Sequence, residues 1–84
     1  MDDHQTTAFV QDLQALLVEA LHITEEQATP NLAFGDLPQW DSMGHMEVMM
    51  LLEQRYNVEI NADTIGALTS VPAIRAYLKE NGHA

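Results

Sequence analysis

The sequence predicts an all-α protein: a small four-helix bundle with three longer helices, a short third helix and a long loop between helices one and two. Three observations support this fold class. Apolar residues recur at helical spacing in separate segments, Pro and Gly interrupt the segment between the first two, and Val58 and Ile60 alternate for too few residues to form a useful sheet. The chain has 84 residues, enough for one domain with a thin core, so we expect residues 1–84 to fold as a single domain.

The first helix is expected over residues 8–21, where apolar side chains form one stripe. The stripe consists of Phe9, Leu13, Leu16 and Ala20, widened by Val10, Leu17 and Leu21. Residues 23–41 hold several Pro and Gly residues and show no sustained period, which predicts a long connection. A structureless loop of this length is unusual in a small domain, so its apolar side chains should be pinned to the core. These side chains are Leu32, Phe34, Leu37 and Trp40.

The second helix is expected over residues 42–56, and Asn57 can end it. Val58 and Ile60 should then form an extended link that buries two side chains. A short third helix follows over residues 61–68.

Either Thr69 or Ser70 can cap the last helix. Its other features are Pro72 in the first turn, an apolar stripe of Val71, Ile74 and Leu78, and Gly82 just after its end.

The composition is strongly acidic. Thirteen carboxylates stand against three basic side chains, giving a net charge of −10. This charge repels polyphosphate and anionic lipid over about 8–10 Å, so neither nucleic acid nor membrane is an expected partner. Partners with basic patches fit better, because opposite fields speed their encounter. Acidity that only keeps the protein soluble fits the composition equally well.

Cysteine is absent, which excludes disulfides and thiolate metal sites and suits a monomer in a reducing cytoplasm. Residues 1–7 lack a basic, apolar leader, and no apolar run is long enough to span a bilayer. We therefore expect a cytoplasmic location. No metal site is expected, because no two histidines have the i, i+4 spacing of ligands on one helix. All four are expected at the surface or at the ends of elements: His4, His22, His45 and His83.

The second helix is apolar on two sides. On a helical wheel one face gathers Val48, Met49, Leu52 and Tyr56, an ordinary core stripe. The opposite face gathers Met43, Met46 and Met50, accompanied by Glu47 and flanked by Glu53. A thin domain rarely buries both faces of one helix, so the second face is either core of a central helix or an exposed binding surface. Methionine suits a surface that must fit several partners, since its thioether chain is flexible.

Asp41 and Ser42 stand at the head of this helix. Free backbone N–H groups and the positive end of the dipole favour an anion there, so a phosphate ester on Ser42 would be stabilised. The alternative is that one of the two residues is simply the helix N-cap.

Residues 40–53, with the sequence Trp-Asp-Ser-Met-Gly-His-Met-Glu-Val-Met-Met-Leu-Leu-Glu, resemble the acyl carrier protein family, in which Asp-Ser-Leu opens the second helix. The aromatic Tyr56 and the extended Val58-Glu59-Ile60 match the family pattern in the same frame. The family layout of helices and loop covers nearly the whole chain. The sequence is thus similar to a free-standing carrier with a single acyl-carrier-like domain.

The resemblance implies that Ser42 carries a 4′-phosphopantetheine arm, transferred from coenzyme A by a phosphopantetheinyl transferase, and that Asp41 helps to position the metal and coenzyme A on that enzyme. The thiol of the arm would carry acyl, aminoacyl or polyketide groups as thioesters between partner enzymes. Glu47 and Glu53 would meet basic patches on those enzymes, and Met43, Met46 and Met50 would supply the apolar contacts. His45, just inside the start of helix two and angled toward the core side, either lines the entrance to a shelter for the acyl chain between helices two and three or is structural, which is the more common role of a lone histidine on a helix.

The sequence departs from the family pattern at a few positions. Met43 replaces the usual Leu, Gly44 replaces an acidic residue at a cost of roughly 0.5–1 kcal/mol in a helix, and Arg55 breaks an acidic run. Trp40 and the pair Gly44-His45 look more like free-standing carriers of specialised pathways, such as polyketide, modified-lipid or amino-acid-loading systems.

Two other functions fit parts of the sequence. Ser42 and His45 have the i, i+3 spacing of a nucleophile and its base, but no oxyanion loop or third orienting group is evident, so we do not expect an enzyme. An unmodified carrier-like interaction module would share the methionine face and the acidity. Such a module would not need a hydroxyl at Ser42.

Overall fold

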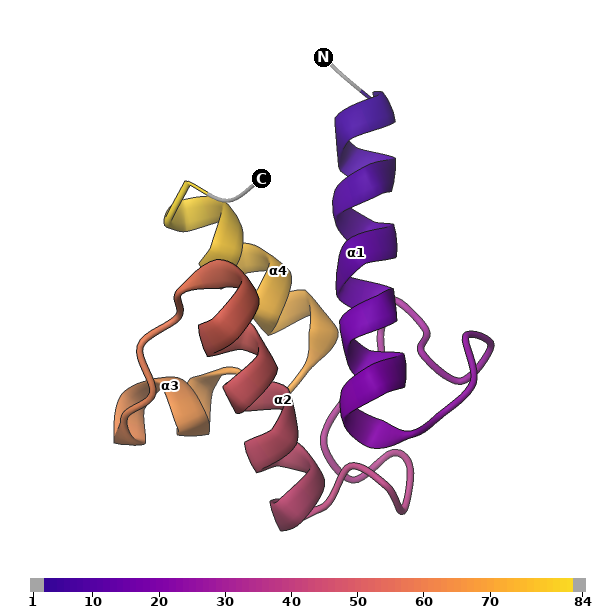
Figure 1. Cartoon of the computed structure of the whole chain (residues 1–84), viewed down its shortest axis with the longest axis vertical. Coiled ribbons are helices and arrows are strands. Elements are labelled where there is room, and N and C mark those ends of the chain that lie inside the picture. The colour runs from indigo at the N-terminus through magenta and orange to yellow at the C-terminus, as the bar shows by residue number, and fades with distance from the viewer. Residues whose placement is uncertain (1–2, 83–84) are drawn as a thin grey trace.

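The structure is a computed structural model that describes residues 3–82, with the side chains of residues 11–82. It has four helices in the order α1 (Asp3–Leu21), α2 (Ser42–Tyr56), α3 (Ala62–Ala67) and α4 (Val71–Glu80) (Figure 1). Between residues 3 and 82 the sole β-type pairing is an isolated antiparallel bridge between Ala33 and Ser70. The all-α class, the short third helix and the long loop before α2 are confirmed.

Helix α1 begins at Asp3 and not at residue 8, so the predicted start was wrong. Periodicity could not place this end, because residues 3–7 carry no apolar stripe. The expected stripe is confirmed from Leu13 onward, whereas the side chains of Phe9 and Val10 lie outside those described.

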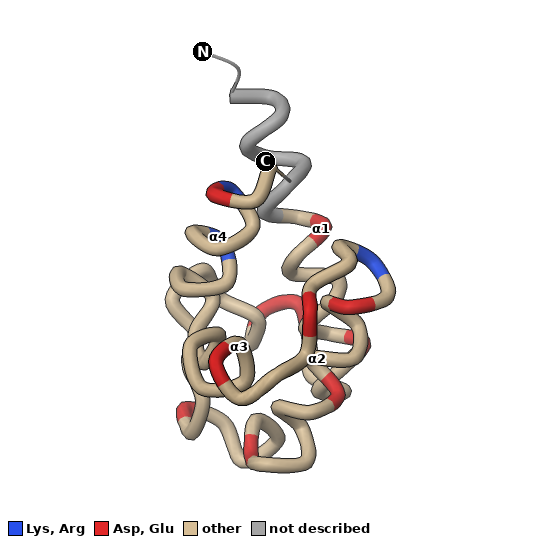
Figure 2. The backbone as a smooth tube through the Cα atoms, turned by 90° about the vertical axis from the view of Figure 1, so that its left-hand side faces the viewer, with Lys and Arg blue, Asp and Glu red and all other residues tan. Residues whose placement is uncertain are grey.

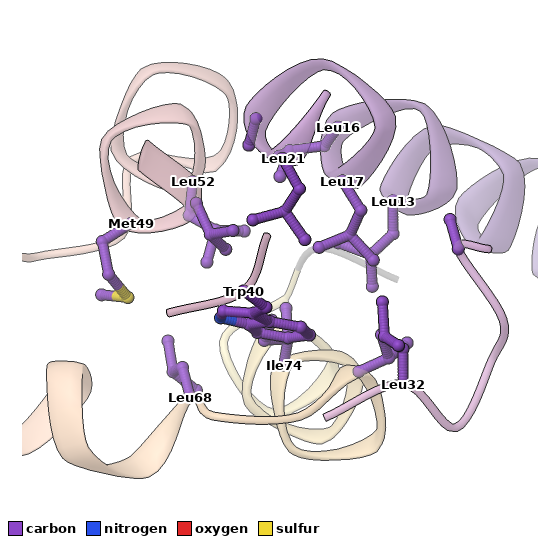
Figure 3. Packing of buried hydrophobic residues seen from close by; sticks show 14 of the residues in the cluster. Leu13, Leu16, Leu17, Leu21, Leu32, Trp40, Met49, Leu52, Leu68 and Ile74 are labelled. Atoms are coloured by element: carbon purple, nitrogen blue, oxygen red, sulfur yellow. The ribbon is translucent and has the colours of Figure 1, made fainter. Parts of the chain in front are cut away.

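The core gathers side chains from α1, the loop, α2 and α4 around Trp40, whose exposed fraction is 0% (Figure 3). Leucines of α1 lie on one side of the indole, and Ile74 of α4 and Leu68 lie on the other. Trp40 thus joins the two halves of a thin core, and burial of its large ring stabilises the fold. The stripe predicted for α4, namely Val71, Ile74 and Leu78, is buried in the same cluster.

The long loop is fixed to the rest of the chain by backbone hydrogen bonds. The N–H of Phe34 donates to the carbonyl of Thr69 at 2.8 Å, and the N–H of Val71 donates to the carbonyl of Leu32 at 2.8 Å. Leu32 is buried as predicted, but the prediction that Phe34 is pinned to the core was wrong, because this side chain is 45% exposed. Its ring lies edge-on against His45, with 5.8 Å between ring centroids, because Trp40 and His45 occupy the interior beside it.

Local side-chain chemistry places the helix ends. Asn57 ends α2 in the left-handed conformation, with φ of 58°. The Asn61 side chain accepts from the Thr64 N–H, while the Thr64 hydroxyl oxygen accepts from the Asn61 N–H, which forms a capping box for α3. Of the two candidate caps for α4, Ser70 is the one used, since its Oγ accepts from the Ala73 N–H at 3.1 Å. These caps set the path of the chain from α2 to α4.

Helix α2 lies between α1 and α3 (Figure 1). At its C-terminal end Arg55 pairs with Glu19 of α1 on the surface. Burial raises the pKa of the nearby Tyr56 phenol, the Asp12 carboxylate raises it further, and Arg55 lowers it. Over residues 3–82, none of the helices is long and apolar enough to cross a membrane.

Candidate modification site at the head of α2

Asp41 and Ser42 divide the two roles that the sequence left open. Asp41 is the N-cap of α2: its backbone is extended, and its Oδ1 accepts from the Gly44 N–H at 2.9 Å. Ser42 is the first residue of the helix and is exposed. Among the described residues its hydroxyl has no hydrogen-bond partner. Capping by Asp41 therefore leaves the Ser42 hydroxyl without an intramolecular hydrogen bond among the described residues, at the positive end of the helix.

Gly44 allows the loop to pass very close to the first turn of α2. A β carbon at this position would lie 2.1 Å from the carbonyl oxygen of Gln39 and 3.0 Å from Cδ2 of Leu21. Non-bonded carbon and oxygen atoms do not approach each other so closely in a relaxed structure, since their contacts are usually about 3.3–3.6 Å. Glycine at this position is thus required by packing, which the sequence reading of Gly44 as a cost to helix stability did not foresee.

His45 is buried, with 4% exposure, and both of its ring nitrogens have partners. The indole Nε1–H of Trp40 lies 3.1 Å from Nδ1, and the carbonyl oxygen of Ile65 lies 2.8 Å from Nε2. An indole N–H can only donate and a carbonyl can only accept, so Nδ1 must be the acceptor and Nε2 must carry the proton. Only the neutral Nε2–H imidazole satisfies both bonds. His45 therefore links the loop, α2 and α3.

This arrangement bears on the four histidines. His45 faces the core side, as predicted, and of the two expected locations, the surface or the end of an element, it occupies the second, because it is buried in the first turn of α2. Its one acceptor nitrogen is used by Trp40, so no lone pair is left to take a proton from Ser42. His22 is exposed, as predicted. The side chains of His4 and His83 lie outside those described, and within the described residues no group of three His, Asp or Glu side chains could hold a metal ion.

The two faces of α2 are as the wheel predicts. On the core side Val48, Met49 and Leu52 each have 0% exposure, and Tyr56 is half-buried. On the opposite side Met43, Met46 and Met50 are 80%, 40% and 44% exposed. The alternative that these three methionines belong to the core is therefore excluded. We call the surface formed by these three methionines the methionine face.

Acidic residues rim the methionine face. Glu47 and Glu53 are both exposed on α2, and Figure 2 shows an acidic segment on α3, whose first turn contains the exposed Asp63. The basic Arg55 of the same helix pairs instead with Glu19 of α1. The surface beside Ser42 thus combines flexible apolar side chains with negative charge, a combination that suits contact with a basic protein surface.

The structure also relates three residues that the sequence had treated separately. Because Gly44 has no β carbon, the carbonyl of Gln39 in the loop can lie against the first turn of α2. Trp40 follows Gln39 in the chain and enters the core, where its indole N–H donates to His45. Trp40, Gly44 and His45 are therefore one packing unit. Packing therefore explains why these three residue types occur here, without reference to a biosynthetic pathway. A sequence signal for it existed, namely a buried-type aromatic one residue before the cap and a histidine one turn after it.

Comparison with known proteins agrees with this geometry. The family described as "phosphopantetheine attachment site" matches residues 11–78, which span the loop, all of α2 to α3 and most of α4. The matched segment contains the serine at the head of α2 together with both faces of that helix. The chain therefore belongs to the acyl carrier protein family.

Individual relatives carry the same name. The acyl carrier proteins of Helicobacter pylori strains J99 and G27 are each 30% identical to this chain over 74 residues, which is 88% of this chain and 95% of theirs. The acyl carrier protein of Helicobacter acinonychis is 27% identical over the same shares. The protein is thus a carrier of the family that bears covalently attached 4′-phosphopantetheine. An exposed serine hydroxyl at a helix N-terminus fits a phosphate ester of that group.

Proposed function

We propose that this protein carries acyl, aminoacyl or polyketide units on a 4′-phosphopantetheine arm attached to Ser42. The observation that supports this assignment is the free, exposed Ser42 hydroxyl on the first residue of α2, with Asp41 supplying the cap beside it. The arm supplies a thiol that holds its cargo as a thioester. The protein supplies the attachment point, orientation and recognition.

Attachment requires a phosphopantetheinyl transferase and coenzyme A. The Ser42 oxygen forms a bond to the phosphorus that bears pantetheine, and the bond from that phosphorus to the bridging pyrophosphate oxygen breaks. The hydroxyl proton is released and adenosine 3′,5′-bisphosphate leaves. The product phosphodiester carries one negative charge, which the N-terminus of α2 favours.

Asp41 has a second role in this proposal. Its Oδ1 is used by the Gly44 N–H, while the carboxylate as a whole is exposed beside Ser42. An exposed carboxylate next to the acceptor hydroxyl can contact the metal that neutralises the coenzyme A phosphates on the transferase. The cap and the metal contact can be separated by substitution, because asparagine caps a helix as well as aspartate does.

The methionine face is the proposed contact surface for the transferase and for the enzymes that load and unload the arm. Met43 is the most exposed of its methionines and lies directly after Ser42. The acid rim of Glu47 and Glu53 steers basic surfaces toward it, which favours fast, short-lived complexes.

Intact mass spectrometry tests the attachment. The chain is co-expressed with a broad-specificity phosphopantetheinyl transferase, and we expect a mass increase of one phosphopantetheine group. The Ser42→Ala variant should remain unmodified at wild-type thermal stability, since Ser42 makes no hydrogen bond that alanine would lose. A wild type without adduct would favour an unmodified interaction module. An adduct on Ser42→Ala would move the site elsewhere.

A further inference from the structure

The contact between α2 and α3 is closed by His45 and filled behind it. His45 lies one turn after Ser42, and its Nε2–H donates across to the Ile65 carbonyl of α3 at 2.8 Å. Behind it, Met49 of α2 and Leu68 at the end of α3 point toward each other beside Trp40 (Figure 3). Met49 and Trp40 are 0% exposed, and Leu68 is 1% exposed. We call this contact the α2–α3 seam.

A cargo on Ser42 has a physical reason to enter this seam. An alkyl chain gains free energy when it leaves water, and the seam is the apolar interior that begins one turn from the attachment point. Entry would have to displace the His45 ring. That movement breaks the bond to Ile65 and leaves the buried Trp40 N–H without its acceptor, a loss that is costly inside a protein.

A surface hollow of about 450 Å³ against α1 does not suit an alkyl chain, because four of the six residues that line it are polar or charged. A cavity of about 60 Å³ lies between α1, the loop and α4, and none of the residues that line it belongs to α2 or α3. Its volume is less than half of the roughly 150 Å³ that accommodates benzene. This cavity is therefore no substitute for the seam.

We propose that His45 locks the α2–α3 seam, so that this carrier keeps its cargo outside the core and is suited to short or polar acyl units. The inference rests on attachment of the arm at Ser42. His45 acts here as a specificity-determining residue: it favours cargo that is soluble without shelter, because a long alkyl chain would remain in water. This reverses the expectation that His45 lines an entrance to a shelter.

Thermal unfolding of loaded protein tests the lock. Acetyl, hexanoyl and dodecanoyl groups are installed by giving the transferase the corresponding acyl-coenzyme A, and intact mass verifies each product. A group that binds the native core raises Tm, so we expect the three wild-type products to agree within about 1 °C. In His45→Ala the dodecanoyl product should melt several degrees above the acetyl product. Met49→Ala widens the same seam but keeps His45 in place. Its acetyl and dodecanoyl products should therefore agree in Tm with each other, as the wild-type products do.

Each outcome is decisive. A wild-type Tm that rises steadily with chain length overturns the proposal, and so does a His45→Ala variant as insensitive to chain length as wild type. If His45→Ala fails to fold, the amide resonances of Ile65 and Leu68 in wild type decide. They should be the same in the acetyl and dodecanoyl products, and a shift confined to the dodecanoyl product refutes the lock. Absence of any adduct would instead refute attachment at Ser42.

Discussion

Replacing Gly44 with alanine should destabilise the protein, although helix propensity alone predicts the opposite. In a helix interior alanine is favoured over glycine by roughly 0.5–1 kcal/mol. Here the new β carbon would lie 2.1 Å from the Gln39 carbonyl oxygen. That is about 1.2 Å inside the shortest usual contact of about 3.3 Å. The obstacle is a backbone atom, so no side-chain rotation relieves it.

The expected magnitude follows from these two opposing terms. Forcing an extra carbon into a packed site costs typically about 1–3 kcal/mol and occasionally more, and an overlap of this size against backbone belongs at the upper end. After subtracting the propensity gain, we expect Gly44→Ala to lower the free energy of unfolding by roughly 2–2.5 kcal/mol. For a domain of this size the corresponding fall in Tm is at least about 8 °C.

Urea unfolding followed by far-ultraviolet circular dichroism measures the change. Gly66→Ala is the matched control, because Gly66 is a helical glycine of α3 whose β carbon would meet nothing within 4 Å. This variant should gain up to about 0.5–1 kcal/mol. Trp40 is the only tryptophan, so its fluorescence reports whether the loop beside Gly44 has moved. A Gly44→Ala variant as stable as wild type, with unchanged fluorescence, would refute the packing argument.

Three further predictions concern α2. Asp41→Ala should lower the free energy of unfolding by about 1 kcal/mol through loss of the cap. Asp41→Asn should keep that stability but slow modification in a transferase assay. Equal modification rates for Asp41→Asn and wild type would contradict the proposed metal contact. Urea unfolding should show that Leu52→Ala lowers the free energy of unfolding by about 2–5 kcal/mol and Met46→Ala by less than about 0.5 kcal/mol. The reverse order would mean that Met46, and not Leu52, faces the core. Glu47→Lys or Glu53→Lys should slow loading by partner enzymes and weaken its salt dependence at unchanged Tm, and a large fall in Tm would instead make the acid rim structural.

The helices and their faces were determined by the sequence because they depend on local periodicity. The wheel separated Leu52 from Met46, and the structure places the first at 0% and the second at 40% exposure. The cap at Asn61 and the left-handed end at Asn57 likewise arise from side chains acting on their own neighbouring backbone. The start of α1 escaped prediction, because its first residues show no apolar repeat that could mark it.

Three features were decided only by the tertiary structure, and each depends on where the long loop runs. Glycine at position 44 is required because a carbonyl five residues earlier crosses the helix. Burial of His45 became possible because Trp40 and Ile65 supply partners for both ring nitrogens. Phe34 is left outside because those rings fill the interior beside it. Loop paths arise from the packing of segments distant in sequence, so helical periodicity does not predict these three outcomes. Ser42, the proposed attachment site, is the contrasting case, since the start of a single helix places it.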